Sequence, residues 1–271
     1  MSRHVKLIIF SAFLVAISLS TFAQDTTGNN NQRRDRRADR RDKISAMVKQ
    51  EEEGILSYTK QSAFGLQLRT NGYGFFYELG RRRSERFTNT YTIEITEIKN
   101  RKEDKLGGDN FFANSYVFGK INNFYQAKLG FGQQYILGQK GNKNGVALTA
   151  NLQGGLSLGL LKPYFVDVLD GSGQPRQIKY DSKDSTLFLD RSVISGGSGF
   201  TVGWGDITMK PGAYVKGALR FDFGRYNESI QALEIGISMD AYSSKIPLMV
   251  FNEPKQIFFQ GHIAFVFGRR K

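Results

Sequence analysis

Hydrophobic residues at every second position are the dominant pattern of this chain. In residues 256–267, one alternate set is almost wholly apolar and consists of Ile257, Phe259, Gly261, Ile263, Phe265 and Phe267. The intervening residues are mixed in polarity. A period of two predicts a β-strand, because successive side chains of a strand point to opposite faces. The same alternation recurs upstream in segments separated by turn-forming residues, so the sequence predicts an all-β protein.

We expect eight antiparallel strands. The pattern places them at residues 63–69, 73–79, 90–98, 124–137, 146–160, 213–223, 230–241 and 256–267. Thr70, Asn71 and Gly72 predict a tight hairpin between the first two strands, since Asn and Gly tolerate positive φ. The predicted connections include a charged segment at 81–89, a polar loop at 99–108 and a long polar excursion at 162–208 with room for a short hairpin. Residues 109–121 fit two interpretations: they prolong the next strand, or they fold over the rim of the sheet.

The N-terminus has the organisation of a secretory signal peptide. Arg3, His4 and Lys6 form a charged region, residues 7–19 are apolar, and cleavage is expected after Ala23. The rest of the chain has no run of about 18 apolar residues that would form a membrane-spanning helix. An exported chain of alternating strands is therefore expected to cross a membrane as a closed barrel, because an open sheet edge in lipid leaves backbone groups unpaired.

These observations predict an antiparallel, up-and-down transmembrane β-barrel at residues 62–268 in the bacterial outer membrane. With an even strand count and a periplasmic N-terminus, the long connections after the third, fifth and seventh strands fall on the outer side. The apolar face of each strand is expected to contact lipid.

Residues 24–61 differ from the barrel in composition. Their basic cluster comprises Arg33, Arg34, Arg36, Arg37, Arg40, Arg41 and Lys43. One interpretation is a solvated periplasmic tail that is disordered or partly helical. The other is an electrostatic contact with anionic head groups, cell-wall polymer or an acidic partner. Nucleic acid is not expected as a partner, because an exported chain does not meet it and no aromatic residue is interleaved with the arginines.

The inward-facing residues predict a filled lumen. An eight-stranded barrel is just wide enough to be filled by its own side chains. The inward charged set is Arg69, Glu78, Glu94, Lys128, Lys216, Arg220, Asp222, Glu234, Asp240 and His262. Because buried charges must be paired, we expect Lys128, Lys216 and Arg220 to face Glu78, Glu94 and Glu234. Such a network would block diffusion; the alternative is a narrow gated path for a small solute.

Catalytic and metal-binding alternatives rest on few residues. His262 is the only histidine that remains after signal cleavage, and Ser238 and Asp240 on the preceding strand could complete a Ser/His/Asp arrangement. The simpler interpretation is an interior histidine satisfied by hydrogen bonds. No cofactor is expected, and one histidine without cysteines does not make a metal-ligand cluster.

Aromatic residues near the predicted strand ends indicate the two membrane interfaces. The expected interface set is Tyr73, Tyr91, Tyr135, Trp204, Phe223 and Phe267. Phe265-Val266-Phe267 resembles the aromatic end-signal of the small eight-stranded OmpA/OmpX-type outer-membrane barrels, and the likeness extends over residues 63–267. The resemblance implies insertion by the barrel-insertion machinery. In that family the signal usually ends the chain, whereas here four residues follow Phe267.

The sequence therefore favours a structural or interaction scaffold in the outer membrane. Its partners would be outer-membrane lipid and a periplasmic or surface protein, in an envelope, secretion or motility assembly. The alternatives are a barrel enzyme that acts on lipid and a narrow solute pore.

Overall fold

The computed structural model describes Arg41, Ser45 and residues 58–107, 114–142, 144–169, 174–181 and 183–271. From residue 58 onward these belong to one compact unit, residues 50–271. The predicted signal peptide lies outside the described residues. So does the basic cluster of the tail apart from Arg41, which is helical and exposed. No helix among the described residues is long and apolar enough to cross a membrane.

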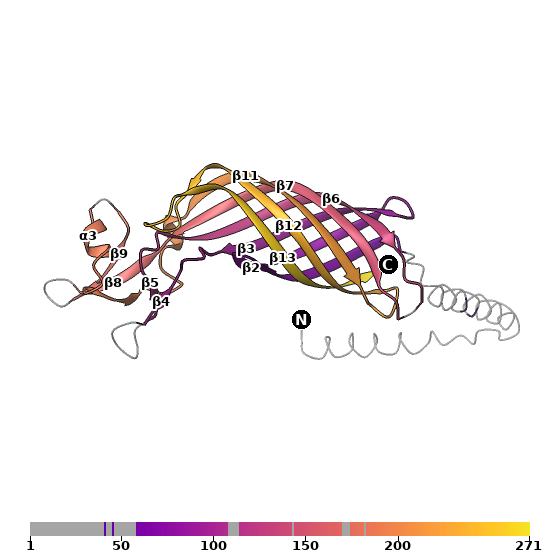
Figure 1. Cartoon of the computed structure of the whole chain (residues 1–271), viewed down its shortest axis with the longest axis horizontal. Coiled ribbons are helices and arrows are strands. Elements are labelled where there is room, and N and C mark those ends of the chain that lie inside the picture. The colour runs from indigo at the N-terminus through magenta and orange to yellow at the C-terminus, as the bar shows by residue number, and fades with distance from the viewer. Residues whose placement is uncertain are drawn as a thin grey trace, which may run out of the picture. The chain divides into compact units, whose positions relative to one another are not determined.

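Eight strands close into an antiparallel barrel (Figure 1). The order around the barrel is β1-β13-β12-β11-β7-β6-β3-β2. The strands are β1 (Lys60–Arg69), β2 (Gly72–Arg82), β3 (Phe87–Ile98), β6 (Asn122–Gly138), β7 (Ala147–Pro163), β11 (Thr208–Asp222), β12 (Ser229–Ile246) and β13 (Lys255–Arg270). Apart from the closing pair, every strand is hydrogen-bonded to its neighbours in the chain order of the barrel strands. The predicted all-β, up-and-down barrel of eight strands is confirmed.

The barrel strands extend beyond the apolar alternation that revealed them. Residues 81–89, expected as a charged connection, belong mainly to the sheet: Arg81 pairs with Asn89 and Arg82 with Thr88. Only residues 83–86 lie between β2 and β3. That prediction was wrong because polar residues at strand ends carry no apolar signal, although their backbone groups continue the ladder.

The barrel has two unlike ends. At the terminal end lie the start of β1, the end of β13 and the turns 83–86, 139–146 and 223–228. At the loop end lie the turn 70–71, the described parts of the connections 99–121 and 164–207, and the connection 247–254. The long connections thus share one end, as the strand parity predicts.

The closing seam joins β1 to β13 from Gln61–Arg270 to Arg69–His262. The residues after Phe267 are part of this seam. The Thr59 and Lys60 amides donate to the Lys271 carbonyl at 2.8 Å, and Arg270 donates to the Asp222 carboxylate. Gly268, Arg269 and Arg270 therefore lengthen the closing strand, and the Lys271 amide donates to the Lys60 carbonyl.

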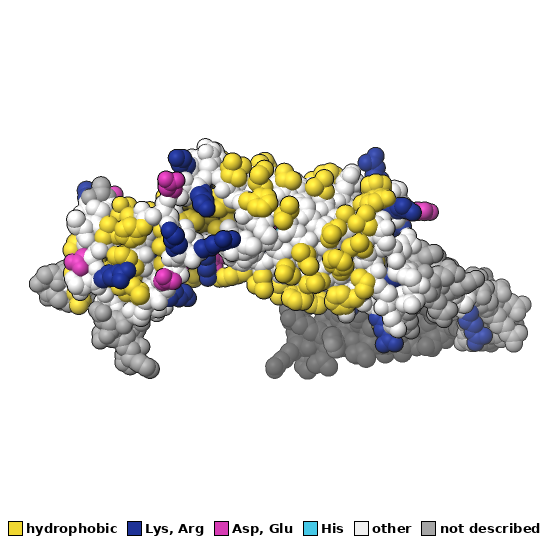
Figure 2. Space-filling model, in the orientation of Figure 1, with side chains coloured by type: hydrophobic (Ala, Val, Ile, Leu, Met, Phe, Trp, Pro, Cys, Tyr) yellow, Lys and Arg dark blue, Asp and Glu magenta, His cyan; other side chains and the backbone are white. Residues whose placement is uncertain are grey.

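The outer wall of the barrel is apolar and the lumen is polar. Leu152, Leu156 and Phe265 are 64%, 71% and 52% exposed, whereas Gln126 and Glu78 are fully buried. Figure 2 shows hydrophobic side chains gathered over the strands, with Lys and Arg side chains where this band ends. A soluble barrel has the opposite distribution. The arrangement is that of a barrel whose wall faces hydrocarbon.

The loop end carries a second small fold. Its three-stranded sheet has the order β10-β8-β9 and consists of β8 (Phe165–Leu169), β9 (Pro175–Lys179) and β10 (Ile194–Gly197). The short helix α3 (Ser185–Phe188) and the 3-10 helix η1 (Trp204–Asp206) complete the described part of 164–207, which we call the platform. Nearby, β4 (Lys105–Leu106) pairs with β5 (Tyr116–Val117).

The platform has its own hydrophobic core. The buried residues are Val166, Val168, Ile178, Phe188 and Ile194, together with Tyr116 from β5. In the glycine-rich stretch 196–199, Gly196 and Gly197 belong to β10. An added Cβ on Gly197 would lie 3.1 Å from the Ser115 carbonyl oxygen, so the glycine permits close packing.

The closing seam yields a prediction from two adjacent arginines. Arg270 is buried against Asp222, whereas Arg269 is exposed. We expect Arg270→Gln to lower the free energy of unfolding by about 2 kcal/mol, because it leaves a buried carboxylate with weaker partners. Arg269→Gln should change it by less than about 0.5 kcal/mol. Urea unfolding of the detergent-folded protein measures both, and equal effects would contradict a role for the Arg270 pair.

Candidate functional site: a filled lumen and a cleft at the loop end

The inward residues of β12 show the three layers of the lumen in order. Ile230 and Ala232 belong to an apolar cluster near the terminal end. Glu234, Ser238 and Asp240 follow as buried polar residues. Tyr242 and Ile246 then join a second apolar cluster near the loop end. The lumen is therefore a charged layer held between two apolar layers.

The terminal side of the charged layer is organised around Arg220 on β11. Its guanidinium donates to Glu78 on β2 at 2.8 Å and to Glu234 on β12 at 2.7 Å. Lys216, two inward positions away on β11, lies 2.9 Å from Glu234 and 3.9 Å from Glu94. These contacts span the lumen, because β2 and β11 are not neighbours in the barrel.

The loop side of the charged layer contains two further cations. Lys128 lies 2.5 Å from Asp240 and 3.5 Å from Glu94. Arg69 lies 3.5 Å from Glu94 and 3.8 Å from Asp240, and it donates to the Ser238 hydroxyl at 2.6 Å. Each of these carboxylates is therefore shared by two or more cations.

The charged layer is electrically balanced. Its four cations are Arg69, Lys128, Lys216 and Arg220, and its four carboxylates are Glu78, Glu94, Glu234 and Asp240, so the formal charges sum to zero. Asp222, the remaining carboxylate of the predicted set, lies near the terminal end. There it pairs with Arg270 and lies 3.8 Å from Lys140. Every buried carboxylate of the predicted set thus lies within 4 Å of a cation, as buried charges require.

His262 belongs to the charged layer, where it meets a carboxylate. Its Nε2 atom lies 3.3 Å from a carboxylate oxygen of Glu234. Ser238 accepts a hydrogen bond from Arg69, and Asp240 accepts one from Gln260 at 2.6 Å. The residues considered for a Ser/His/Asp arrangement are therefore all buried, and each is bonded to a different partner. Among the described residues, no group of three or more His, Asp or Glu is placed to hold a metal ion.

Aromatic rings fill the loop side of the lumen, and one of them requires a glycine opposite. On the loop side, Phe124 and Phe258 lie with ring centroids 5.5 Å apart, and Phe124 also meets Tyr242 edge-on at 5.3 Å. Tyr214 projects over Gly130, where an added Cβ would lie 1.9 Å from the Tyr214 hydroxyl oxygen. Glycine is required at this position because the opposing ring occupies the space of a side chain.

The six predicted interface aromatics lie at both ends of the apolar wall. Tyr73 and Trp204 lie toward the loop end, where Trp204 stacks on Tyr125 with centroids 5.9 Å apart. The others lie toward the terminal end: Tyr91, Tyr135, Phe223 and Phe267. Five of the six are 43–56% exposed, and Tyr135 is half-buried.

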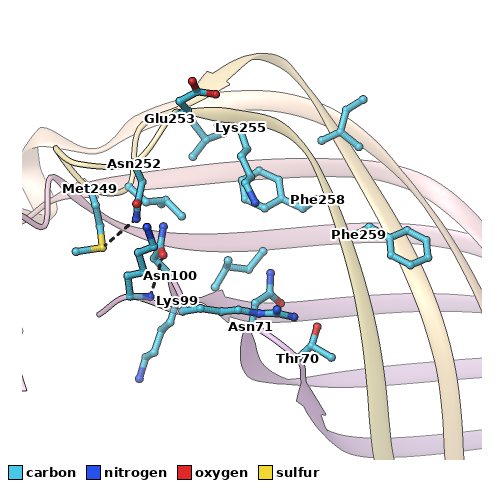
Figure 3. Close-up of a pocket in the computed structure, with 16 residues that line it drawn as sticks. Thr70, Asn71, Lys99, Asn100, Met249, Asn252, Glu253, Lys255, Phe258 and Phe259 are labelled. Carbon is cyan, nitrogen blue, oxygen red and sulfur yellow. Dashed lines mark hydrogen bonds between the residues drawn. The ribbon is translucent and has the colours of Figure 1, made fainter. Parts of the chain in front are cut away.

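A cleft of about 500 Å³ opens at the loop end (Figure 3). It is lined by the turn 70–71, by residues 98–102 at and after the end of β3, and by nine residues between 246 and 259 in the β12–β13 hairpin. Its basic residues are Lys99, Arg101, Lys102 and Lys255, and its one acidic residue is Glu253. Buried apolar residues, among them Leu248, Met249 and Phe258, form its floor.

The sequence interpretation missed both the cleft and the core of the platform. The cleft brings together three connections that lie far apart in the chain, so no local pattern marks it. The platform strands are only four or five residues long, which is too short for a clear period. A usable signal was the β-branched, apolar character of Val166, Val168 and Ile178.

Comparisons with known proteins return small outer-membrane barrels at low similarity. Ail, the attachment invasion locus protein of Yersinia pestis, crystallised with the heparin analogue sucrose octasulfate, is 8% identical with a TM-score of 0.36, over 79% of this chain and 100% of that one. Neisserial surface protein A is 10% identical with a TM-score of 0.36, and the match covers 78% of this chain and 96% of that one. The N-terminal β-barrel domain of Pseudomonas aeruginosa OprF is 8% identical with a TM-score of 0.35, and the match covers 78% of this chain and 99% of that one.

No protein-family model and no curated protein matches the chain. Likeness at these TM-scores supports no inference about activity. The assignment of the fold therefore rests on the closed hydrogen-bonded ladder of this chain, which has the eight-stranded architecture of the small outer-membrane barrels.

The charged layer yields a prediction for Arg220. Replacing it with methionine leaves Glu78 and Glu234 without their shared partner, so Arg220→Met should destabilise the folded barrel by about 3–5 kcal/mol. Arg225 is an exposed turn residue, and Arg225→Met should change stability by less than about 0.5 kcal/mol. Urea titration followed by heat-modifiable gel mobility measures both. An Arg220 variant as stable as the wild type would refute the proposed electrostatic dependence.

Proposed function

We propose that this protein is an outer-membrane barrel that acts as a scaffold and presents the platform as an interaction surface. The single observation that carries the proposal is that the lumen is filled while the platform folds around its own core. The wall is covered by apolar side chains, and the lumen is occupied by paired charges. The surfaces left for a partner are therefore the two ends.

The apolar wall supports the membrane location. Exposed Leu, Ile and Phe side chains cover every barrel strand, as in Leu66 on β1, Ile93 on β3 and Leu219 on β11. A soluble monomer rarely exposes a contiguous patch of this extent. With a secretory signal and a periplasmic N-terminus, the loop end and its platform would face the outside of the cell.

The platform is suited to binding because it is preorganised. Tyr164 links it to β5: its hydroxyl accepts a hydrogen bond from the Val117 N–H at 3.0 Å, and burial raises the pKa of this hydroxyl above its ordinary value. Leu169 and Leu187 remain 49% and 40% exposed on the platform surface. A folded loop loses less conformational entropy on binding than a flexible one. The basic tail, residues 33–43, is a second proposed contact site, for a periplasmic partner.

A filled lumen predicts no ion conduction. Purified protein added to planar lipid bilayers should give no unitary conductance steps, because the charged layer and two apolar layers occupy the lumen. Heat-modifiable gel mobility and vesicle flotation must show that the same preparation is folded and inserted. Reproducible steps that scale with salt concentration, and that heat-denatured protein does not give, would favour the solute pore.

The interaction role predicts that capture of a partner depends on an end of the barrel. Three forms should be compared in crosslinking and affinity capture from intact cells: the full chain, Leu169→Ser with Leu187→Ser, and a chain without residues 24–53. We expect the platform variant to lose a surface partner and the shortened chain to lose a periplasmic one. A partner set unchanged in both altered forms, with the barrel folded, would count against the scaffold role.

A further inference from the structure

We propose that the cleft at the loop end binds the phosphorylated head group of an outer-leaflet lipid. This inference rests on the proposed membrane location. It goes beyond that proposal because it assigns a ligand class to a particular site. The relevant features are its charge, its apolar floor and its continuity with the wall.

The charge of the cleft favours an anion. Its lining has four cations, Lys99, Arg101, Lys102 and Lys255, and one carboxylate, Glu253, which gives a formal charge of +3. Glu97 lies 4.0 Å from Lys99 and lowers the sum by one when it is included. Arg101, Lys102 and Lys255 are exposed, and Lys99 has a side chain 40% exposed. These cations contrast with the lumen, where every cation of the charged layer is buried and paired with carboxylates.

The cationic rim is held in place by its own segment. The Asn100 amide donates to Glu103 at 2.9 Å, and the Asn100 side chain accepts a hydrogen bond from the Lys102 amide at 3.1 Å. Glu103 in turn pairs with Lys120 at 2.7 Å. Lys99 lies over the ring of Tyr73, with its Nζ 4.8 Å from the centroid. Residues 99–102 therefore form an ordered turn, so their cations are positioned before any ligand arrives.

The floor and outer side of the cleft favour an amphiphile. Leu248, Met249 and Phe258 are buried at its floor, while Ile257 and Phe259 are 59% and 70% exposed on the outer wall. Figure 3 shows Phe259 pointing away from the polar residues of the cleft, while Phe258, beside it in sequence, lies among them. A lipid can satisfy both environments, with acyl chains along the wall and an anionic head group among the cations. A soluble anion makes no use of the adjoining apolar wall.

The polar lining provides donors beyond the lysines and arginine. Thr70, Asn71 and Asn252 line the cleft with neutral hydrogen-bonding groups, and Asn252 also contacts the Met249 sulfur at 3.7 Å. Phosphate oxygens and sugar hydroxyls accept hydrogen bonds from such groups. The cavity of about 500 Å³ lies within the size range of small-molecule sites. A phosphorylated sugar lipid fits this combination of charge, polarity and size.

Lipid binding to the full mature chain can be measured by native mass spectrometry from detergent micelles. The probes are lipid A with both phosphates, the same lipid without phosphates, and inorganic phosphate. The wild type should bind the phosphorylated lipid at least about tenfold more tightly than the dephosphorylated one, since each basic residue near an anionic surface contributes on the order of fivefold. Inorganic phosphate at equal concentration should not displace the lipid.

Two charge-matched triple variants test the location. Lys99→Gln, Arg101→Gln and Lys102→Gln together should weaken binding of the phosphorylated lipid by about tenfold or more. Arg176→Gln, Lys179→Gln and Lys183→Gln remove the same charge from the platform, outside the cleft, and should change affinity by less than about twofold. If the first variant does not fold, Lys255→Gln alone should weaken binding by about threefold to fivefold.

Three outcomes would overturn the inference. They are equal affinity for the two lipids, equal effects of the two triple variants, and displacement of the lipid by inorganic phosphate. Flotation with phosphatidylethanolamine vesicles separates this failure from that of the membrane location. A wild type that floats but does not prefer phosphate refutes the lipid site alone, whereas a wild type that does not float refutes the proposed location as well.

Discussion

The hydrogen-bonded seam between β1 and β13 is the constraint on which the rest of the structure depends. In hydrocarbon, an unpaired strand edge costs several kcal/mol per backbone group, so the sheet must close on itself. The seam continues past the aromatic signal, because the Lys271 carbonyl accepts from both Thr59 and Lys60. Gly268, Arg269 and Arg270 are therefore part of the closing strand. A shorter β13 would leave the first residues of β1 without partners.

Closure with eight strands also determines the contents of the lumen. A barrel of this width has room for side chains and little else. The inward charges then have to pair across the lumen, as Arg220 does with Glu78 and Glu234. Since a buried charge without a partner is strongly destabilising, each residue of the layer constrains the others. The interior stabilises the barrel, which leaves the two ends for interactions with other molecules.

The sequence predicts the eight strands and their faces because both follow from a local period of two. For example, the outward position of Leu152 and the inward position of Gln153 can be predicted without knowledge of the rest of the fold. The inward faces also predict which charges share the lumen, but the particular carboxylate that each cation meets depends on register across the barrel. His262 on β13 was considered with Ser238 and Asp240 on β12. It meets Glu234 instead, which is also on β12 but nearer the terminal end. The cleft and the platform depend on contacts between distant loops, and sequence periodicity carries no information about those.

The two ends differ in a way that bears on the scaffold role. At the terminal end, Tyr58 is 7% exposed and bonds Thr88 through its hydroxyl at 3.0 Å. Arg82 and Arg270 both lie with their guanidinium carbons 5.2 Å from its ring centroid. Tyr58 thus fixes the start of β1 to β2, β3 and β13 at the seam. A chain segment that precedes Tyr58 is therefore attached at the closing seam. The loop end, in contrast, carries exposed cations and the platform with its own core. A scaffold that links a periplasmic partner to the cell surface needs both properties, a rigid attachment on one side and an accessible surface on the other.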